Sequence, residues 1–187
     1  MQEIKKKRIF IALNLPNNTK NEISSLINNL EIKNKGIKWT QKENLHLTLH
    51  FLGYLNNEQI EKVEQIINSL ATQFKEMEFS IKEINAFPNL HQPRVIVLSG
   101  QQTNGTTVFD LQREIGEKLK ESGFIVENRA WKLHLTLGRV KSYNYKFEIP
   151  EDLKVKINNF KISSFELMES ELMLEGPIYK VVKSYKL

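Results

Sequence analysis

The chain has 187 residues, of which 40% are hydrophobic and 26% are charged, and its formal net charge at pH 7 is +5. This balance is typical of an ordinary globular protein, and the positive charge favours polyanionic partners. The absence of cysteine excludes disulfides, thiol nucleophiles and cysteine metal sites, and it fits a reducing, cytoplasmic location. No run approaches the ~20 apolar residues of a membrane span, and the apolar run at 9–13 is too short for a signal peptide.

The first half of the chain predicts strands and helices in alternation. The apolar run 8–13 indicates a buried strand, and apolar residues at helical spacing over 23–30 predict a helix with Thr19 as its cap. Alternation over 39–51 predicts a second strand. An amphipathic pattern from 57 to about 74 predicts a second helix.

The second half also places a predicted helix between predicted strands. Strand-like stretches at 79–87 and 94–98 precede a predicted helix at about 107–121. A further strand is expected within 131–140, and the tail from 155 to 187 reads as strands broken by turn residues.

The alternation in both halves predicts the architecture. We expect an α+β fold formed by a single compact bilobal domain over residues 1–187. Two pseudo-symmetric antiparallel sheets should face a central cleft, with the helices outside.

The four-residue word His-Leu-Thr-Leu occurs twice, in LHLTLHF at 45–51 and in LHLTLGR at 133–139. With four histidines in the chain, a chance repeat of this kind is expected about twice in a thousand chains of ordinary composition. The repeated word therefore indicates a shared role for the two segments.

In a strand, the histidine and threonine of each word lie on one face and the leucines on the other. If the two strands meet at a cleft, His46, Thr48, His134 and Thr136 surround one point. One histidine can donate a proton near pH 7 while the other accepts one, and the threonine hydroxyls can bind the oxygens of a tetrahedral anion. This set suits in-line displacement at a phosphodiester without a metal or other cofactor. Duplicated core packing remains the alternative.

A metal site is not expected. His46 and His50 have a spacing that can bind one ion on a helix, but on a strand they lie roughly 13 Å apart. His50 has no counterpart in the second word, where Gly138 stands. We expect His50 at the periphery of the cleft or on the surface.

The chain resembles the 2H phosphoesterases, which are defined by two His-x-Thr-x motifs. More narrowly, it resembles the bacterial and archaeal RNA 2′,3′-cyclic phosphodiesterases, also called 2′-5′ RNA ligases. The resemblance spans nearly the whole chain and rests on RIFIALNLP, ENLHLTLHFLG, FPNLHQPRVIVL, WKLHLTLGRV and ESELMLEGPIYKVV. Two flanks depart from the common pattern: Leu133 replaces a proline, and a second proline is missing before Glu43. We expect these changes to alter loop stiffness rather than chemistry.

The resemblance implies metal-independent hydrolysis of RNA 2′,3′-cyclic phosphates to 2′-phosphomonoesters, with reversible 2′-5′ ligation as a further activity. It implies His46 as the acid and His134 as the base, with Thr48 and Thr136 binding the phosphate. The symmetry of the sequence alone leaves the two histidine roles interchangeable.

The resemblance also implies that Arg139 helps to bind the phosphate and that Phe51 lies near the nucleobase. In a regular strand both side chains would point away from the histidine face, so Arg139 requires a bulge or a strand end near Gly138. The alternatives are a solvent-exposed Arg139 and a core position for Phe51.

Two other functions remain open: a basic RNA-binding module without turnover, and a 2H enzyme that acts on another cyclic phosphate. A bell-shaped pH–rate profile would distinguish an enzyme from simple binding. In each case the expected partners are RNA or nucleotides, with no membrane, and the protein is expected to be a monomer.

Overall fold

The computed structural model describes residues 6–105, 107–127, 130–174 and 176–187. Within these ranges the chain forms three α-helices and nine strands, which confirms the α+β prediction. The helices are α1 (Asn17–Lys33), α2 (Asn57–Ala71) and α3 (Thr107–Glu121). The strands are β1 (Lys7–Asn14), β2 (Ile37–Trp39), β3 (His46–Leu55), β4 (Met77–Phe87), β5 (Val95–Gln102), β6 (His134–Val140), β7 (Phe160–Ile162), β8 (Ser164–Met173) and β9 (Gly176–Lys186); a short 3-10 turn, η1 (Lys42–Asn44), precedes β3.

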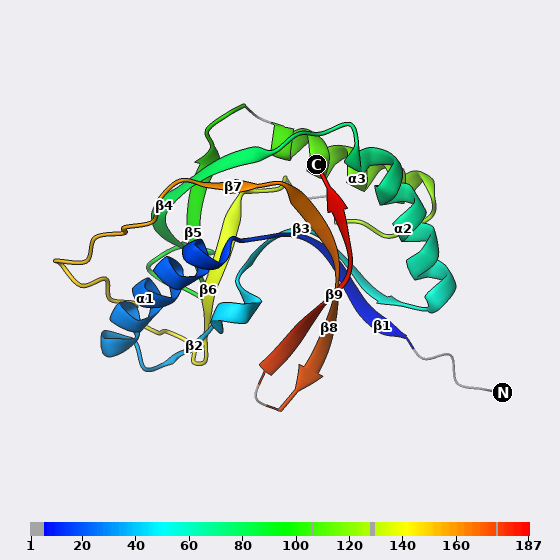
Figure 1. Ribbon diagram of the computed structural model, residues 1–187. Coiled ribbons are helices and arrows are strands. Elements are labelled where there is room, and N and C mark those ends of the chain that lie inside the picture. The colour runs from blue at the N-terminus through cyan, green and yellow to red at the C-terminus, as the bar shows by residue number, and fades with distance from the viewer. Residues whose placement is uncertain (1–5, 106, 128–129, 175) are drawn as a thin grey trace.

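The strands form one curled antiparallel sheet in the order β7-β4-β5-β6-β3-β1-β8-β9, and β2 pairs with β6 (Figure 1). Its two halves meet where β3 pairs with β6 through Leu47 and Leu135. The two predicted sheets are therefore present as the halves of one continuous sheet. The sequence pattern did not indicate the pairing that joins them.

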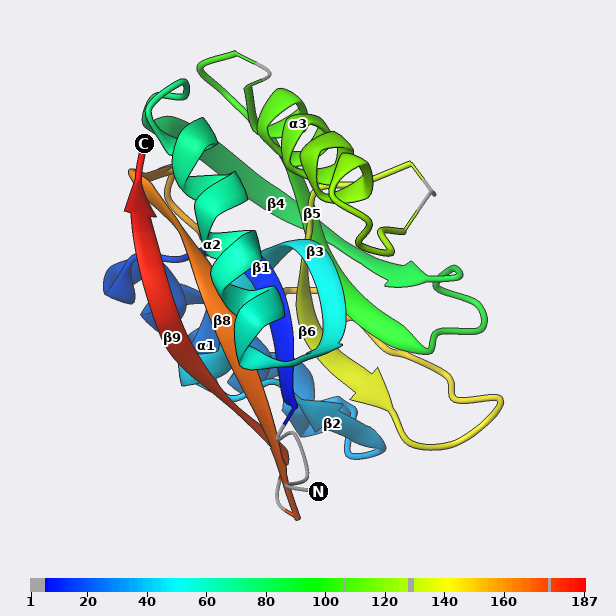
Figure 2. The same ribbon diagram turned by 90° about the vertical axis from the view of Figure 1, so that its right-hand side faces the viewer.

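The two halves have matching connectivity at their centres. In each half, a strand leads through a helix to its antiparallel neighbour: β1-α1-β3 in the first half and β5-α3-β6 in the second. Helix α3 contacts β3 and α2, and α2 contacts β9, whereas α1 contacts β2 and η1. The helices lie on the outer side of the curled sheet, α1 at one end and α2 with α3 at the other (Figures 1 and 2).

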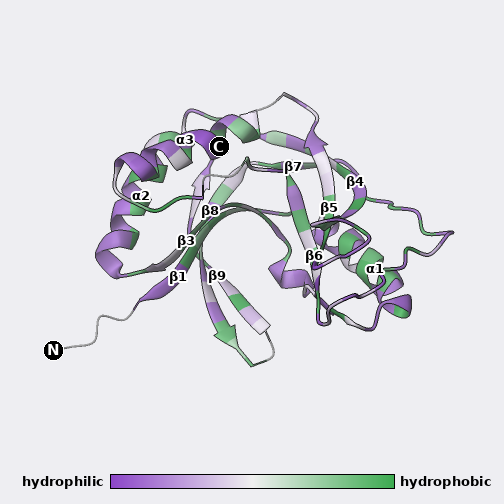
Figure 3. Ribbon diagram, turned by 180° about the vertical axis from the view of Figure 1, so that it is seen from behind, coloured by the Kyte–Doolittle hydropathy of each residue, from purple (hydrophilic) through white to green (hydrophobic). Residues whose placement is uncertain are grey.

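Amphipathic helices and alternating strands form the core between the helices and the sheet. In α2 the predicted apolar positions are buried, namely Ile60, Val63, Ile67 and Leu70. The helix begins with a capping box, in which Asn56 accepts a hydrogen bond from the Gln59 backbone and the Gln59 side chain accepts one in return. In Figure 3, α2 and α3 carry hydrophobic and hydrophilic residues side by side. None of the helices in the described ranges is long and apolar enough to cross a membrane.

The predicted cap of α1 is wrong. Thr19 is 1% exposed and lies inside the helix, which begins at Asn17 after Pro16. Pro16 is the N-cap residue, with φ −57° and ψ 149°, and as a proline it has no amide hydrogen that would need a partner at the helix start. Here the Pro16 carbonyl accepts from the amide of Lys20 at 3.0 Å.

We predict that the β3–β6 junction is essential for stability. Leu47 and Leu135 are both fully buried. Replacing either by alanine should lower the free energy of unfolding by about 2–5 kcal/mol through lost burial and a residual cavity. Urea unfolding would measure this change. Ile125→Ala is the control, because Ile125 is 93% exposed and surface changes usually stay within about 0.5 kcal/mol. Equal stability of Leu47→Ala and wild type would contradict the prediction.

Candidate active site

The two motif strands lie side by side at the centre of the sheet. Leu47 pairs with Leu135, so continuing the antiparallel register places His46 across from Thr136 and Thr48 across from His134. The leucines point into the core, and the four polar side chains therefore meet on the opposite, concave face.

Both histidines are oriented by the same backbone contact. The Nδ1 atom of His46 lies 2.7 Å from the carbonyl oxygen of Asn44, and Nδ1 of His134 lies 2.7 Å from that of Lys132. A carbonyl oxygen only accepts, so Nδ1 carries the proton in each ring. When either imidazole is neutral, its Nε2 has a free lone pair. Nε2 of His46 lies 2.9 Å from the Thr48 hydroxyl, which then donates to it.

Each histidine ring also meets the edge of an aromatic ring. Tyr179 of β9 contacts His46 with ring centres 5.1 Å apart and ring planes at 88°. Phe87 of β4 contacts His134 with the same distance and angle. The near twofold symmetry thus extends to the aromatic neighbours, and the hydroxyl of Tyr179 is a difference between the two sides.

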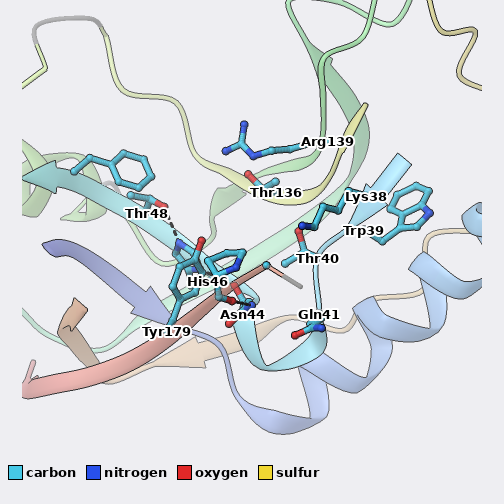
Figure 4. Close-up of a pocket in the computed structure, with 13 residues that line it drawn as sticks. Lys38, Trp39, Thr40, Gln41, Asn44, His46, Thr48, Thr136, Arg139 and Tyr179 are labelled. Atoms are coloured by element: carbon cyan, nitrogen blue, oxygen red, sulfur yellow. Dashed lines mark hydrogen bonds between the residues drawn. The ribbon is translucent and has the colours of Figure 1, made fainter. Parts of the chain in front are cut away.

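A cavity of about 150 Å³ opens beside His46 and Thr48 (Figure 4). Thr136 and Arg139 come to it from β6, and Tyr179 comes from β9. The remaining lining residues are Lys38, Trp39, Thr40, Gln41, Asn44, Phe51, Gly176 and Pro177. Tyr179 is a site residue that the sequence patterns did not indicate. It lies in the segment ESELMLEGPIYKVV, which carries part of the family resemblance.

The bulge expected near Gly138 is present. In the β5–β6 pairing, Ile96 faces Gly138 and Val97 faces Thr136, so β6 contains one extra residue. This residue reverses the alternation, and Arg139 reaches the concave face with Thr136, where its side chain lines the cavity and is also exposed to solvent, as the alternative expected. A side chain at Gly138 would not fit, because a Cβ there would lie 2.7 Å from Ile37 and 2.9 Å from the Trp39 ring.

Strand β3 has the matching bulge. Ile11 of β1 faces His50 and Ala12 faces Thr48, which leaves one extra residue at the same distance from the motif histidine. The bulge turns Phe51 to the concave face, where it lines the cavity and is 56% exposed. The core alternative for Phe51 is therefore wrong.

The bulge also corrects the prediction for His50. This side chain is 5% exposed and points to the opposite face, where Nε2 lies 2.7 Å from the carbonyl oxygen of Gln112 in α3. The absence of a side chain at Gly116 makes room for the ring, since a Cβ there would lie 2.9 Å from it. Burial lowers the pKa of His50, and its role is to pack α3 against the sheet.

The environment of His46 favours the neutral imidazole. Burial lowers its pKa from 6.5 to about 4, and the charges of Lys20 and His134 act in the same direction. The Asn44 carbonyl opposes them, because its hydrogen bond with the ring raises the pKa. In the unliganded cleft His46 is therefore neutral at pH 7.

The described residues contain no group of three or more His, Asp or Glu side chains placed to hold a metal ion. The cationic groups at the cavity are Lys38 and Arg139. This set of residues is suited to binding an anion.

A curled sheet with two facing His-Thr pairs defines a phosphoesterase of the two-histidine class. The chain matches the LigT-like phosphoesterase family over residues 13–97 and 101–179, and it belongs to this family. The predicted family is thus confirmed. The chain is 36% identical over 182 residues to the RNA 2′,3′-cyclic phosphodiesterase of Methanocaldococcus jannaschii, and the match covers 95% of this chain and 99% of that protein.

Solved structures show the same fold. A crystal structure from Thermus thermophilus matches with a TM-score of 0.82 at 24% identity, covering 96% of this chain and 97% of that one. Escherichia coli LigT in complex with 3′-AMP matches with a TM-score of 0.79 at 20% identity, covering 98% and 99% of the two chains. The curled sheet and its helices are therefore shared at low sequence identity.

We predict that His46 titrates near pH 4 in the folded protein, as its pKa indicates. In the unfolded chain it should titrate near its ordinary value, so as the pH falls the unfolded state takes up this proton first. The contribution of His46 to stability is therefore complete above about pH 6.5 and is lost as the pH falls toward 4. NMR titration of the imidazole would measure the pKa. A His46→Gln variant should lose less stability over this range, and a midpoint near 6.5 in wild type would contradict the prediction.

Proposed function

We propose that this protein is an RNA 2′,3′-cyclic phosphodiesterase that forms 2′-phosphomonoesters, with reversible 2′-5′ ligation as a second reaction of the same site. The observation that carries the proposal is the position of two His-Thr pairs on one concave face, where His46, Thr48 and Thr136 line a cavity that also contains two cationic side chains. Membership of the LigT-like phosphoesterase family supports it, as does the name of the relative from M. jannaschii.

In the proposed hydrolysis, His134 takes a proton from water as the water oxygen attacks phosphorus. The bond from phosphorus to the 3′ oxygen breaks, His46 protonates that oxygen, and the phosphate stays on the 2′ oxygen. Hydrogen bonds from Thr48 and Thr136 and the charge of Arg139 stabilise the negative charge that builds on the phosphate. Proton transfer and charge stabilisation are thus both supplied by side chains.

The proposed acid role of His46 requires a proton that the unliganded site disfavours. A bound phosphate anion would supply the opposite charge that raises the pKa of the imidazole. Substrate binding and protonation of His46 should then occur together. In the ligation direction the two histidines exchange roles, because each step runs in reverse.

The proposal also includes a residue that contacts the base, and the domain organisation, oligomeric state and location of the protein. Phe51 lines the cavity, and we place the base of the terminal nucleotide against it. We further propose that residues 1–187 act as one monomeric domain in the cytoplasm. The continuous sheet supports the single domain.

We predict that His46→Ala and His134→Ala each lower turnover of a short RNA with a 2′,3′-cyclic phosphate end by at least ~10²-fold, because each removes one proton-transfer group. Wild-type turnover should be unchanged in EDTA, since no step uses a metal. Chromatography would separate 2′- from 3′-phosphate products. His91→Ala is the matched control, because His91 lies exposed in a loop.

Three outcomes would contradict parts of this proposal. Full activity in either histidine variant would exclude the two-histidine mechanism, and loss of activity in EDTA would exclude metal independence. Wild type that binds the RNA but never cleaves it would indicate a binding module.

We predict that Thr48→Val and Thr136→Val each lower kcat by about 10²-fold, the usual effect of losing one donor to a developing anion. Valine keeps the shape of threonine without the hydroxyl, so the thermal melting of both variants should stay close to wild type. Steady-state kinetics on the same RNA would measure kcat. A change in KM alone would show that the hydroxyls bind the substrate and the transition state equally.

A further inference from the structure

The concave face of β1 and β3 continues beyond the cavity. Phe10 faces Phe51 in the β1–β3 pairing, and Arg8 faces Tyr54. Phe51 is 56% exposed and Tyr54 is 61% exposed. Phe10 packs beneath this surface, with its ring centre 5.1 Å from that of His46 and 6.0 Å from that of Phe51. A row of aromatic rings thus leads from the catalytic histidine toward the N-terminal end of β1.

The spacing of this row suits consecutive nucleotides. Arg8 and Phe10 lie two positions apart on β1, so their partners Tyr54 and Phe51 are separated by about 7 Å along the strand. A second irregularity in the β1–β3 pairing lies between Ile9 and Phe10, where β3 contains another extra residue in addition to the one at the first bulge. It keeps Phe51 and Tyr54 on the same face despite the two residues between them.

The charge on this surface favours a polyanion. Arg8 is exposed, and its charge reaches the site: it lowers the pKa of Tyr179, as Arg139 also does, against the larger effect of burial that raises it. The concave positions of β1 and β3 carry no carboxylate; they are Arg8, Phe10, Ala12, Asn14, His46, Thr48, Phe51 and Tyr54. Exposed rings beside a cation form the kind of surface on which single-stranded nucleic acids stack.

We propose that Tyr54 and Arg8 bind the nucleotide that precedes the cyclic-phosphate end of an RNA strand. Its base stacks on Tyr54, and the phosphate that links it to the terminal nucleotide pairs with Arg8. This proposal rests on the proposed function and adds that the preferred substrate is an RNA strand rather than a mononucleotide.

The test compares 2′,3′-cyclic AMP with a tetra-adenylate that ends in a 2′,3′-cyclic phosphate. Tyr54→Ala and Arg8→Gln should each lower kcat/KM for the tetranucleotide by about 10-fold, as loss of one stacked base or one phosphate contact does. Both variants should turn over cyclic AMP at the wild-type rate. Tyr54→Phe, which keeps the ring, should behave as wild type. Tyr143→Ala, at an aromatic residue that is 80% exposed, follows β6 and contacts Arg94, should have no effect.

Salt dependence gives a second readout. The affinity of the tetranucleotide for Arg8→Gln should fall less steeply with salt than that for wild type, by a slope of about 0.7 per lost phosphate contact. Tyr54→Ala should keep the wild-type slope.

Equal losses on both substrates, or no loss on either, would overturn the proposal. Inactive wild type would instead be a failure of the proposed function. In that case fluorescence anisotropy with a labelled tetra-adenylate still tests the surface: weaker binding by both variants supports it, and unchanged binding overturns it.

Discussion

The pairing of Leu47 with Leu135 is the contact on which the rest of the molecule depends. It joins the two halves of the sheet, and because side chains alternate along strands it also fixes which face each motif presents. Both leucines must be buried, so helices have to cover the outer face. The histidines and threonines are then left together on the concave face. One apolar pair thus couples the stability of the fold to the geometry of the site.

The two bulges bring Arg139 and Phe51 to the concave face, where regular strands would not place them. Without an extra residue in β6, Arg139 would point into the core with Leu135 and Leu137, where an unpaired guanidinium is strongly unfavourable. Without the one in β3, His50 would join the cleft and Phe51 would be buried. The two strands therefore bring the motif pair and the residue five positions after each histidine to the same surface. Gly138 on one strand and His50 on the other occupy the buried side of each bulge.

Much of this could be predicted from the sequence because the signals are local. The helical spacing in residues 57–74 and the alternation around each His-Leu-Thr-Leu word lie within single elements, and the repeat of the word indicated a shared role for the two strands. The position of His50 could not be predicted, since alternation alone does not show where a strand bulges. Tyr179 and the β3–β6 pairing were also missed. Both depend on contacts between segments that are far apart in the chain. A local sequence pattern predicts a strand or a helix, but it does not indicate which distant strand lies beside it.

The near twofold symmetry of the site has a consequence for regiochemistry. Two equivalent imidazoles flanking a cyclic phosphate would cleave either ester bond, because exchanging the 2′ and 3′ oxygens would exchange only the histidines. A single product therefore requires groups that break the symmetry. The structure has two such pairs: Phe51 opposite Arg139 at the bulges, and Tyr179 opposite Phe87 at the ring edges. In the proposed reaction the two motifs would supply the reactivity, and these unlike neighbours would decide which ester bond is cleaved.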